Sequence, residues 1–423
     1  MHLHKNNNVN EVVKKGLCTS CGICIGACFH KAITFEYGKE RNIPVINNGL
    51  CINCGLCYKV CPGKGIQLNA ISNNLFGDEQ NIKYNQYVGR YLYAFVGYSC
   101  NEELRFHGAT GGMVSQFLVY LLEKGIIDGA VVVRYKKNSP FEPEPFIASK
   151  KEEIIAGKGS KYVVVSMDKV VEQLLESDYK KVVVVGLPCH IQGFRHLVKL
   201  KKNIREKIIG FFSIYCSVNK TKHSIDYYSY RYNINPLSVK EFSFRDDGCM
   251  GFMKYTDHDN KTIKKIPYKS YWFGTHSFFV NNRCTLCIDQ LGELADISFG
   301  DIHIEPYKND TIGTNSIITR SNYWNSLLLK CYHDDFINLN NIDIESLIDS
   351  QTYVKIYKKG AGVRTKFLIR RLLCKINPEY DYRFTDNIKI KYIISELIKA
   401  SMRVIGRYRF LWFIIKFLDR NKD

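Results

Sequence analysis

Runs of consecutive apolar residues alternate along the middle of this chain with segments whose apolar residues recur every three or four positions. The runs GAVVVRY, KYVVVS, KVVVVG, KIIGFFSIYC and ADISFG predict strands at residues 129–135, 161–166, 181–186, 207–216 and 295–300. Helices are predicted at 111–125, where Met113, Phe117, Tyr120 and Leu121 share one face, and at 168–178. Unbroken valine runs are typical of strands covered on both faces, which predicts an α/β domain.

The pattern changes after about residue 360, where it becomes helical and basic. From residue 355 to the end, 18 Lys and Arg stand against 6 Asp and Glu, so this segment carries +12 of the net charge of +19. Its longest uncharged apolar run, residues 410–415, is far too short to cross a bilayer, which takes about 20 residues. Two interpretations remain open: an amphipathic helix lying on a membrane or a partner, and a helix packed on the protein's own body. Basic residues are interleaved with apolar helix positions and no nucleic-acid-binding motif is present, so we expect no nucleic-acid partner.

A duplicated cysteine segment lies near the N-terminus. CTSCGICIGACFHKAI (18–33) and CINCGLCYKVCPGKGI (51–66) align without gaps at an offset of 33, and each contains C-x2-C-x2-C-x3-C. In this spacing the first three thiolates of a run bind one 4Fe-4S cluster and the fourth binds the other. The predicted ligands are Cys18, Cys21, Cys24 and Cys61 for one cluster, and Cys51, Cys54, Cys57 and Cys28 for the second. Cysteine quartets also bind zinc, but eight cysteines in this doubled spacing favour clusters.

Sixteen cysteines in 423 residues are many, yet well below the density of a small disulfide-stapled secreted protein. The first residues, MHLHKNNNVNEVVKKG, are polar and lack the apolar stretch of a secretory signal. We therefore expect a cytoplasmic protein, with a peripheral contact at the inner membrane face left open by the basic C-terminal segment.

Four further motifs and a strand-ending cysteine lie in the α/β region. RFHGATGGMV places a glycine-rich turn before the helix predicted at 111–125, an arrangement that suits a phosphate, and GSKY follows at 159–162. GLPCHIQG begins where the strand at 181–186 ends, so Cys189 lies where open α/β sheets place their chemistry. Cys216 likewise ends a strand, and RCTLC adds Cys284 and Cys287.

The order and spacing of HGATGG, GSKY, GLPCHIQG, Cys216, FRDDGCMG (244–251) and RCTLCIDQLGELADISFGD resemble the beta-subunit family of coenzyme F-420 hydrogenase/dehydrogenase, from about residue 90 to 305. Residues 13–68 resemble a bacterial-type two-cluster ferredoxin. The resemblance implies an iron–sulfur flavoprotein oxidoreductase that moves hydride between FAD and coenzyme F-420 and passes single electrons along clusters. It also implies a third 4Fe-4S cluster on Cys189, Cys216, Cys284 and Cys287. Residues implied to line FAD are His107, Gly108, Ala109, Thr110, Gly111, Gly112, Ser160, Lys161, Tyr162, Gly186, Pro188 and Arg245, with Asp296 and Asp301 at the border of the same site.

Two other functions remain open. The chain could be an electron-relay subunit of a larger redox complex, or a reductase associated with surface-polysaccharide biosynthesis, as some bacterial relatives are. The turn at 248–251 reads Gly-Cys-Met-Gly where several family members have Gly-Trp-Pro-Gly, so the organic substrate also stays open. Cys249 and the isolated Cys100, Cys331 and Cys374 are expected to bind no cluster. Structural, hydrogen-bonded roles are favoured for His107 and His190.

Together these features predict an α+β and α/β architecture in five parts. They are a polar tail (1–12), a two-cluster ferredoxin domain (13–75), a linker (76–89), an α/β domain for FAD and an iron–sulfur cluster (90–350), and a basic helical extension (351–423). Catalytic residues are not assigned, and a redox partner protein is expected.

Overall fold

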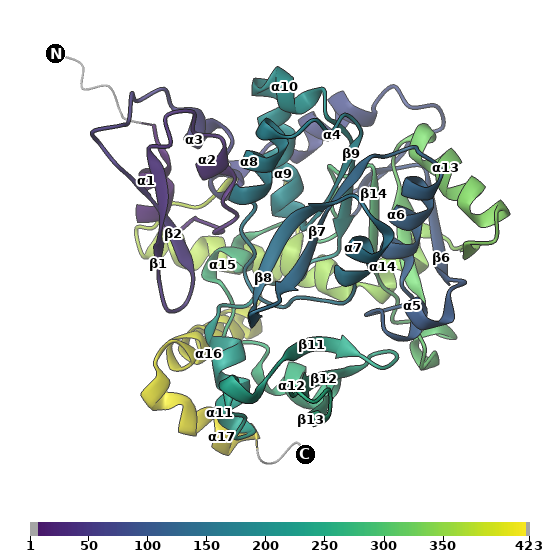
Figure 1. Ribbon diagram of the computed structural model, residues 1–423. Helices are drawn as coiled ribbons and strands as arrows, with labels where there is room; N and C mark the ends of the chain where they lie inside the picture. The colour runs from purple at the N-terminus through teal and green to yellow at the C-terminus, as the bar shows by residue number, and fades with distance from the viewer. Residues whose placement is uncertain (1–6, 420–423) are drawn as a thin grey trace.

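An eight-stranded mixed sheet forms the centre of the molecule, in a computed structural model that describes residues 7–419 (Figure 1). Its four central strands are parallel, and the strands toward both edges are antiparallel. The predicted α/β fold and four of the five predicted strands are therefore confirmed. In order across the sheet the strands are β16 (Ile337–Asn341), β6 (Tyr93–Ser99), β15 (Asn315–Thr319), β14 (Ile297–Asp301), β10 (Ile208–Ile214), β9 (Val182–Gly186), β7 (Gly129–Lys136) and β8 (Ser139–Ala148).

Helices cover both faces of this sheet because alternate valines of β9 point to opposite sides. Val182 and Val184 pack in one core with α8 (Asp168–Glu176) and α9 (Pro188–Leu200). Val183 and Val185 pack in a second core with α6 (Met113–Glu123) and α13 (Asn322–His333). Two of these helices, α6 and α8, are the ones that the apolar periodicity predicts.

The strand predicted at 161–166 is wrong. The segment is extended but pairs with no strand of the sheet. The Val164 N–H donates to the carbonyl of Lys220, and the Met167 N–H donates to that of Cys21. Val163 and Val165 are buried. The valines therefore serve to pack this crossing segment between the ferredoxin unit and the rest of the chain, which a β-rich pattern cannot distinguish from a strand.

The N-terminal ferredoxin unit lies at one side of the sheet (Figure 1). Its first helix begins within the predicted polar tail, where Val9 and Val12 are buried, so the unit begins earlier than predicted. Residues 1–6 of that tail lie outside the described residues. Strands β1 and β2 pair antiparallel. The elements are α1 (Val9–Lys14), α2 (Ile23–Gly26), β1 (Ile33–Tyr37), β2 (Asn42–Ile46), α3 (Leu56–Lys59), the 3-10 turn η1 (Pro62–Lys64) and β3 (Gly65–Ile66).

The linker predicted at 76–89 consists of turns and a hairpin, and it is preceded by a helix that the sequence does not reveal. Helix α4 (Leu68–Phe76) buries Leu68, Ile71 and Phe76 on one face, a pattern masked in the sequence by the asparagines and serines between them. A hairpin of β4 (Lys83–Asn85) and β5 (Gly89–Tyr91) follows. The connection without regular structure is therefore limited to the short turns around this hairpin.

A smaller three-stranded antiparallel sheet lies below the main sheet in Figure 1. It consists of β11 (Glu241–Asp246), β12 (Phe252–Thr256) and β13 (Thr262–Pro267), and shares an aromatic core with α11 (His223–Arg231) and α12 (Tyr268–Thr275). The remaining short helices are α5 (Glu102–Phe106), α7 (Lys151–Ala156), α10 (Lys202–Arg205) and α14 (Ile344–Ser350).

The basic extension folds back over the rest of the chain. It contains the π-helical turn η5 (Val354–Lys358), α15 (Ala361–Leu372), β17 (Glu379–Tyr380), α16 (Ile390–Arg407) and α17 (Trp412–Asp419), and residues 420–423 lie outside the described part. Strand β17 pairs with β3 of the ferredoxin unit, and Trp412 and Ile415 are buried in the aromatic core. Within residues 7–419, no helix is long and apolar enough to cross a membrane.

Candidate iron–sulfur and flavin site

The two cysteine repeats fold into the same local shape. In each run the residue after the second cysteine is a glycine, Gly22 or Gly55, with φ of 75° or 71°, and a one-turn helix begins there. Glycine adopts this left-handed conformation at little cost, so the chain turns sharply between the second and third cysteine of each run.

The fourth cysteine of each run lies beside the thiols of the other run. Burial raises the pKa of Cys61 to about 12, with Cys21 and Cys18 as the nearby thiols that raise it further. Burial also raises the pKa of Cys57, and Cys28 contributes to that rise. The thiols therefore have the crossed arrangement that the sequence predicts, and cluster ligation itself stays a prediction.

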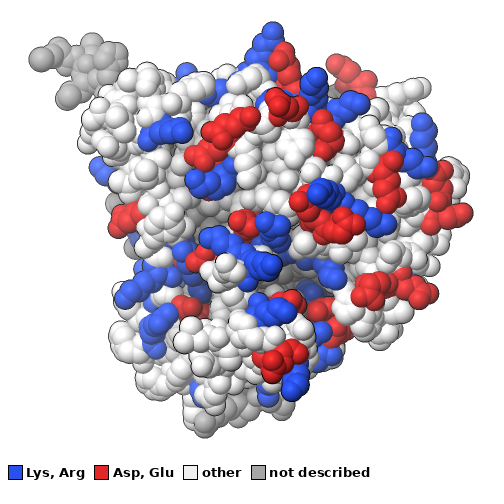
Figure 2. Space-filling view, viewed as in Figure 1, with Lys and Arg blue, Asp and Glu red and all other residues white. Residues whose placement is uncertain are grey.

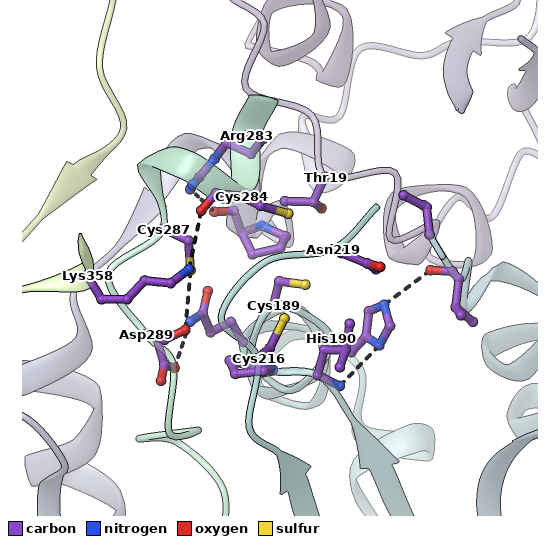
Figure 3. Close-up of a pocket in the computed structure, with 16 residues that line it drawn as sticks. Thr19, Cys189, His190, Cys216, Asn219, Arg283, Cys284, Cys287, Asp289 and Lys358 are labelled. Atoms are coloured by element: carbon purple, nitrogen blue, oxygen red, sulfur yellow. Dashed lines mark hydrogen bonds between the residues drawn. The ribbon is translucent and has the colours of Figure 1, made fainter. Parts of the chain in front are cut away.

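Four other cysteines line one pocket, although they are far apart in the sequence (Figure 3). Cys189 lies in the first turn of α9, directly after β9, and Cys216 lies two residues beyond β10. Cys284 and Cys287 come from the 3-10 turn η3 (Asn282–Leu286) and the residue that follows it. The carboxyl ends of parallel strands β9 and β10 meet at one edge of the sheet, which brings the first two together. In Figure 3 the sulfur atoms of Cys189, Cys216 and Cys284 point into the same space.

The electrostatics of this pocket favour a cationic centre. Burial raises the pKa of Cys189, Cys216 and Cys284 above the ordinary thiol value, and neighbouring cysteines raise it further. Lys358 opposes the rise at Cys216 and Cys284, and its Nζ donates to the carbonyl of Cys284 at 3.2 Å. Thiols must lose their protons to bind metal, and a bound cation is what makes several buried thiolates compatible with one another.

The spacing of the thiols distinguishes a single zinc ion from a larger group. A tetrahedral site with Zn–S bonds of about 2.3 Å places its sulfurs about 3.8 Å apart. Among residues 7–419, the only group of three or more His, Cys, Asp or Glu whose ligand atoms all lie within 4.8 Å of one another is His107, Asp246 and Asp247. Within the described residues, no cysteine quartet has its sulfurs gathered around a single ion in this way.

The pocket also touches the ferredoxin unit. Thr19 and Pro62 form part of its wall, and Cys21 is one of the thiols that raise the pKa of Cys189 after burial. Arg283 ties the two parts together, because its Nε donates to the carbonyl of Gly63 at 2.8 Å. The first ferredoxin cysteine set is therefore adjacent to the set from the α/β domain.

His190, at the same pocket, is held by the backbone. The Leu187 N–H donates to Nδ1 at 3.3 Å, so Nε2 carries the proton that it donates to the Val165 carbonyl at 3.2 Å. Burial lowers its pKa to about 4. Two residues that the resemblance assigns to FAD also lie here: Pro188 lines the cysteine pocket, and Gly186 packs against the His190 side chain.

The glycine-rich loop before α6 offers unused backbone donors. Within the described residues, none of the five consecutive N–H groups from Gly108 to Gly112 donates to a protein acceptor. Gly108, Thr110 and Gly111 are nevertheless buried. Buried N–H groups without a partner are rare and costly, and the nearby helix N-terminus favours negative charge. The Met113 N–H is already taken by Asn315 Oδ1 at 3.2 Å, so the loop itself, more than the helix end, suits an anion such as a pyrophosphate.

A polar network joins this loop to the turn at 245–251 and to β14. The Arg245 guanidinium donates to Asp301 Oδ2 at 2.7 Å and lies 3.4 Å from the Tyr162 hydroxyl, and the Thr110 hydroxyl donates to the Asp301 carboxylate. His107 Nδ1 lies 2.7 Å from Asp246 Oδ1. Burial alone would raise the pKa of Asp301, but Arg245 and the hydrogen bonds hold it below its usual value. The structure thus gathers residues from four separate motifs into one network. Figure 2 shows a hollow between the main sheet and the β11–β13 sheet, with Lys and Arg on its rim.

Two predicted residues have other partners. Lys161 turns its ammonium to the carbonyls of Gly157, Lys158 and Gly159, and burial lowers its pKa to about 7. Asp296 precedes β14, whereas Asp301 ends it, and Asp296 pairs instead with Arg195 at 3.0 Å. The prediction that Asp296 borders the same site is wrong, because a five-residue strand separates its two ends by roughly 16 Å.

Several residues of the cysteine pocket are given no role on the basis of the sequence. They are Thr19, Asn219, Arg283, Asp289 and Lys358. Arg283 directly precedes the Cys-x-x-Cys and Asn219 follows Cys216 by three positions, so closeness in sequence could have suggested them. Lys358 comes from the basic segment, where nothing in the sequence distinguishes it from its neighbours.

Comparison with known proteins identifies the domains of this chain. The family model described as coenzyme F420 hydrogenase/dehydrogenase, beta subunit, matches with its N-terminal part at residues 94–172 and its C-terminal part at 179–345, and a 4Fe-4S dicluster domain matches residues 17–65. The chain is 29% identical over 249 residues to the coenzyme F420 hydrogenase subunit beta of Methanothermobacter thermautotrophicus, covering 57% of this chain and 81% of that one. It is 25% identical over 306 residues to the coenzyme F420-dependent sulfite reductase of Methanocaldococcus jannaschii, covering 69% of this chain and 43% of the relative.

A solved structure shares the fold. A chain of the F420-reducing [NiFe] hydrogenase complex from Methanosarcina barkeri superposes with a TM-score of 0.54 at 22% identity, over 69% of this chain and 96% of that one. With its two beta-subunit regions in order behind a dicluster domain, the chain belongs to the coenzyme F420 hydrogenase/dehydrogenase beta-subunit family, a family of oxidoreductases.

Proposed function

We propose that this protein is an iron–sulfur flavoprotein that moves electrons, through FAD, between a two-electron organic partner and its own 4Fe-4S clusters. The observation that carries the proposal is that Cys189, Cys216, Cys284 and Cys287 line one pocket, whose wall includes Thr19 and Pro62 of the ferredoxin unit. A third cluster at these four thiols would lie next to the first ferredoxin cluster.

FAD would be held by the loop from His107 to Gly112, with Ser160, Tyr162 and Arg245 beside it. The five free N–H groups of the loop fit a pyrophosphate, and this fit supports the assignment. A bound flavin supplies two-electron chemistry toward an organic molecule and one-electron chemistry toward clusters.

The chain's own residues position and tune these groups. The Arg245–Asp301 pair keeps a buried guanidinium fixed beside the glycine-rich loop. The Asp301 carboxylate holds the Arg245 side chain in this position. Lys358 offsets the negative charge of the thiolates. Arg283, bound to the Gly63 carbonyl, fixes the separation between the two cysteine sets.

The organic partner is proposed to be reduced coenzyme F420 or a related molecule. Relatives named as coenzyme F420 hydrogenase subunit beta and as coenzyme F420-dependent sulfite reductase support this class of substrate. Reduction of a dye by the purified chain with reduced F420 is the direct assay, and inertness toward it would remove F420 from the proposal.

A redox partner protein completes the proposal. Several relatives are named as subunits, including one from the F(420)H(2) dehydrogenase of Methanosarcina mazei, which supports assembly with another chain. If the purified chain is inert until a partner is added, it is an electron-relay subunit; if it turns over alone, it has a substrate of its own.

The deciding experiment is the iron, acid-labile sulfide and flavin content of anaerobically purified protein. About twelve irons and one FAD per chain are expected, since each of three cubane clusters holds four irons. About eight irons with FAD would refute the third cluster, and about eight without FAD would leave the ferredoxin unit alone.

A variant pair tests the flavin assignment separately. Arg245→Met should lower the flavin content and leave the iron content unchanged. Arg134→Met is the matched control, because Arg134 of β7 forms a partly exposed ion pair with Glu144 of β8. This variant should keep the wild-type flavin and iron contents. Equal flavin content in the two variants would contradict the role of Arg245.

A further inference from the structure

Helix α16 buries an ion-paired glutamate and packs only Met402 and Ile405 on the aromatic core, so most of its large apolar side chains face solvent. Glu396 is buried and pairs with Lys366 of α15 at 3.5 Å and with Arg403 at 2.6 Å. The opposite face exposes the large apolar side chains, each more than half exposed; they are Ile390, Ile394, Leu397, Ile398 and Val404. An ordinary surface helix has the reverse orientation, with its apolar face on the core.

The following helix extends the same exposed face. In α17, Trp412 and Ile415 are buried in the aromatic core, which anchors the helix to the body. Its other side and the turn before it expose Phe410, Phe413, Phe417 and Leu418, again each more than half exposed. With Tyr408, ten of the 29 exposed large apolar side chains of the described residues fall between 390 and 418. We call these ten residues the apolar face.

Basic residues accompany the apolar face. Between residues 387 and 418 the chain has seven Lys and Arg and one acidic residue, Glu396, which is buried and paired. Three of the seven have carboxylate partners: Arg403 pairs with Glu396, Arg407 with Glu40 and Arg409 with Asp226. The other four are lysines, and Lys389 and Lys391 are exposed at the start of α16. Figure 1 places α16 and α17 together at the lower left, and Figure 2 shows Lys and Arg with few acidic side chains over that part of the surface.

We propose that the apolar face docks on an anionic lipid surface, with α16 and α17 lying in the plane of the membrane. Large exposed apolar groups such as these rarely stay in water, and a rim of Lys and Arg next to Phe, Leu and Ile is the pattern of interfacial helices. A second copy of this chain is disfavoured as the occupant, because a two-fold interface would bring the same basic rims together. This inference does not depend on the redox function proposed above, since it uses no residue of the cysteine pocket or of the proposed flavin-binding loop.

The test is flotation of the full-length protein with vesicles. Vesicles of phosphatidylglycerol and phosphatidylcholine in equal parts should bind the protein at low salt, about tenfold more tightly than phosphatidylcholine alone, and 0.5 M salt should reduce this difference. Replacing Phe413 and Phe417 together by Glu should abolish binding. Replacing Leu397 by Glu on α16 gives a second, independent variant. Tyr323→Glu, at an exposed aromatic of α13 on another part of the molecule, is the matched control and should bind as wild type.

Iron content and a thermal melt verify that each variant is folded. We expect all of them to fold, because the replaced side chains are exposed and touch no proposed ligand. Failure of wild type to bind the anionic vesicles overturns the proposal, as does binding by the Phe413/Phe417 variant at wild-type strength. If the wild type is a dimer and the Phe413/Phe417 variant is a monomer, the apolar face binds a second copy of this chain. If the wild type is a monomer and binds no vesicle, the apolar face is assigned to a protein partner. Either result overturns the lipid assignment and leaves the redox proposal untouched.

Discussion

Lys358 is the residue that most directly tests the proposed third cluster. It belongs to the basic extension, yet its side chain is only 2% exposed and its Nζ lies 3.2 Å from the Cys284 carbonyl. Burial raises the pKa of the Cys216 and Cys284 thiols, and the positive charge of Lys358 acts in the opposite direction. Lys358→Met keeps a long unbranched side chain and removes the charge together with the hydrogen bond to the Cys284 carbonyl.

The expected change is in the reduction potential of the cluster. Reduction adds one negative charge, which the Lys358 ammonium stabilises. At an effective dielectric constant of about 20, two unit charges attract by about 4 kcal/mol at 4 Å and about 2 kcal/mol at 8 Å. For a one-electron couple this range corresponds to about 90 to 170 mV. Lys358→Met should therefore make the third cluster harder to reduce, shifting its midpoint to more negative potential by that amount.

The assay is an anaerobic redox titration of the full-length protein followed by electron paramagnetic resonance, with Cys216→Ser to identify the signal of the third cluster. Lys355→Met is the matched control, because Lys355 lies on the same turn, is about one third exposed and pairs with Asp349. Solvent screens its charge, so its shift should stay below about 20 mV. Lys358→Arg should keep the wild-type potential. If Lys358→Met retains all its iron and shifts no more than Lys355→Met, Lys358 does not face a cluster.

Three other changes test separate parts of the molecule. Cys284→Ser should remove about four irons and leave about eight, since the ferredoxin sets are intact; chemical iron analysis that returned twelve would show that Cys284 is not a ligand. The pKa of Asp301 is held below its ordinary value of 3.8, so its contribution to stability is present above that pH and is lost as the pH falls through the lower folded value. The difference in unfolding free energy between wild type and Asp301→Asn should therefore shrink from pH 6 to pH 3 in urea titrations, and a constant difference would argue against the ion pair. Lys359 Nζ lies 2.6 Å from the carboxylate of Glu293, whose side chain is 2% exposed. Lys359→Met leaves this buried carboxylate without its ion-pair partner and should destabilise the protein by about 3 to 5 kcal/mol. A loss below about 1 kcal/mol in the same titrations would mean that water or another cation replaces the lysine.

Much of the architecture follows from local sequence patterns. The cysteine repeat, the valine strands β7, β9, β10 and β14, and the helices α6 and α8 all depend on residues close together in the chain, so period and spacing suffice to find them. The wrong strand at 161–166 and the missed helix α4 show where local patterns are insufficient. Val163 to Val165 have strand composition but no neighbouring strand to pair with, and the helical face of α4 is concealed between polar residues.

The sequence by itself determined the candidate groups for the chemistry: eight thiols in two runs, four more in three separate motifs, and a glycine-rich loop. Tertiary structure alone decided which of them meet. The parallel packing of β9 and β10 brings Cys189 to Cys216, and the extension delivers Lys358 to the same pocket from more than 70 residues beyond Cys284. It also decided that Glu396 of α16 faces the protein, where it pairs with Lys366 and Arg403, while most of the helix's large apolar side chains stay in solvent. Periodicity identifies an amphipathic helix, but which of its faces is buried depends on the partners that folding places beside it.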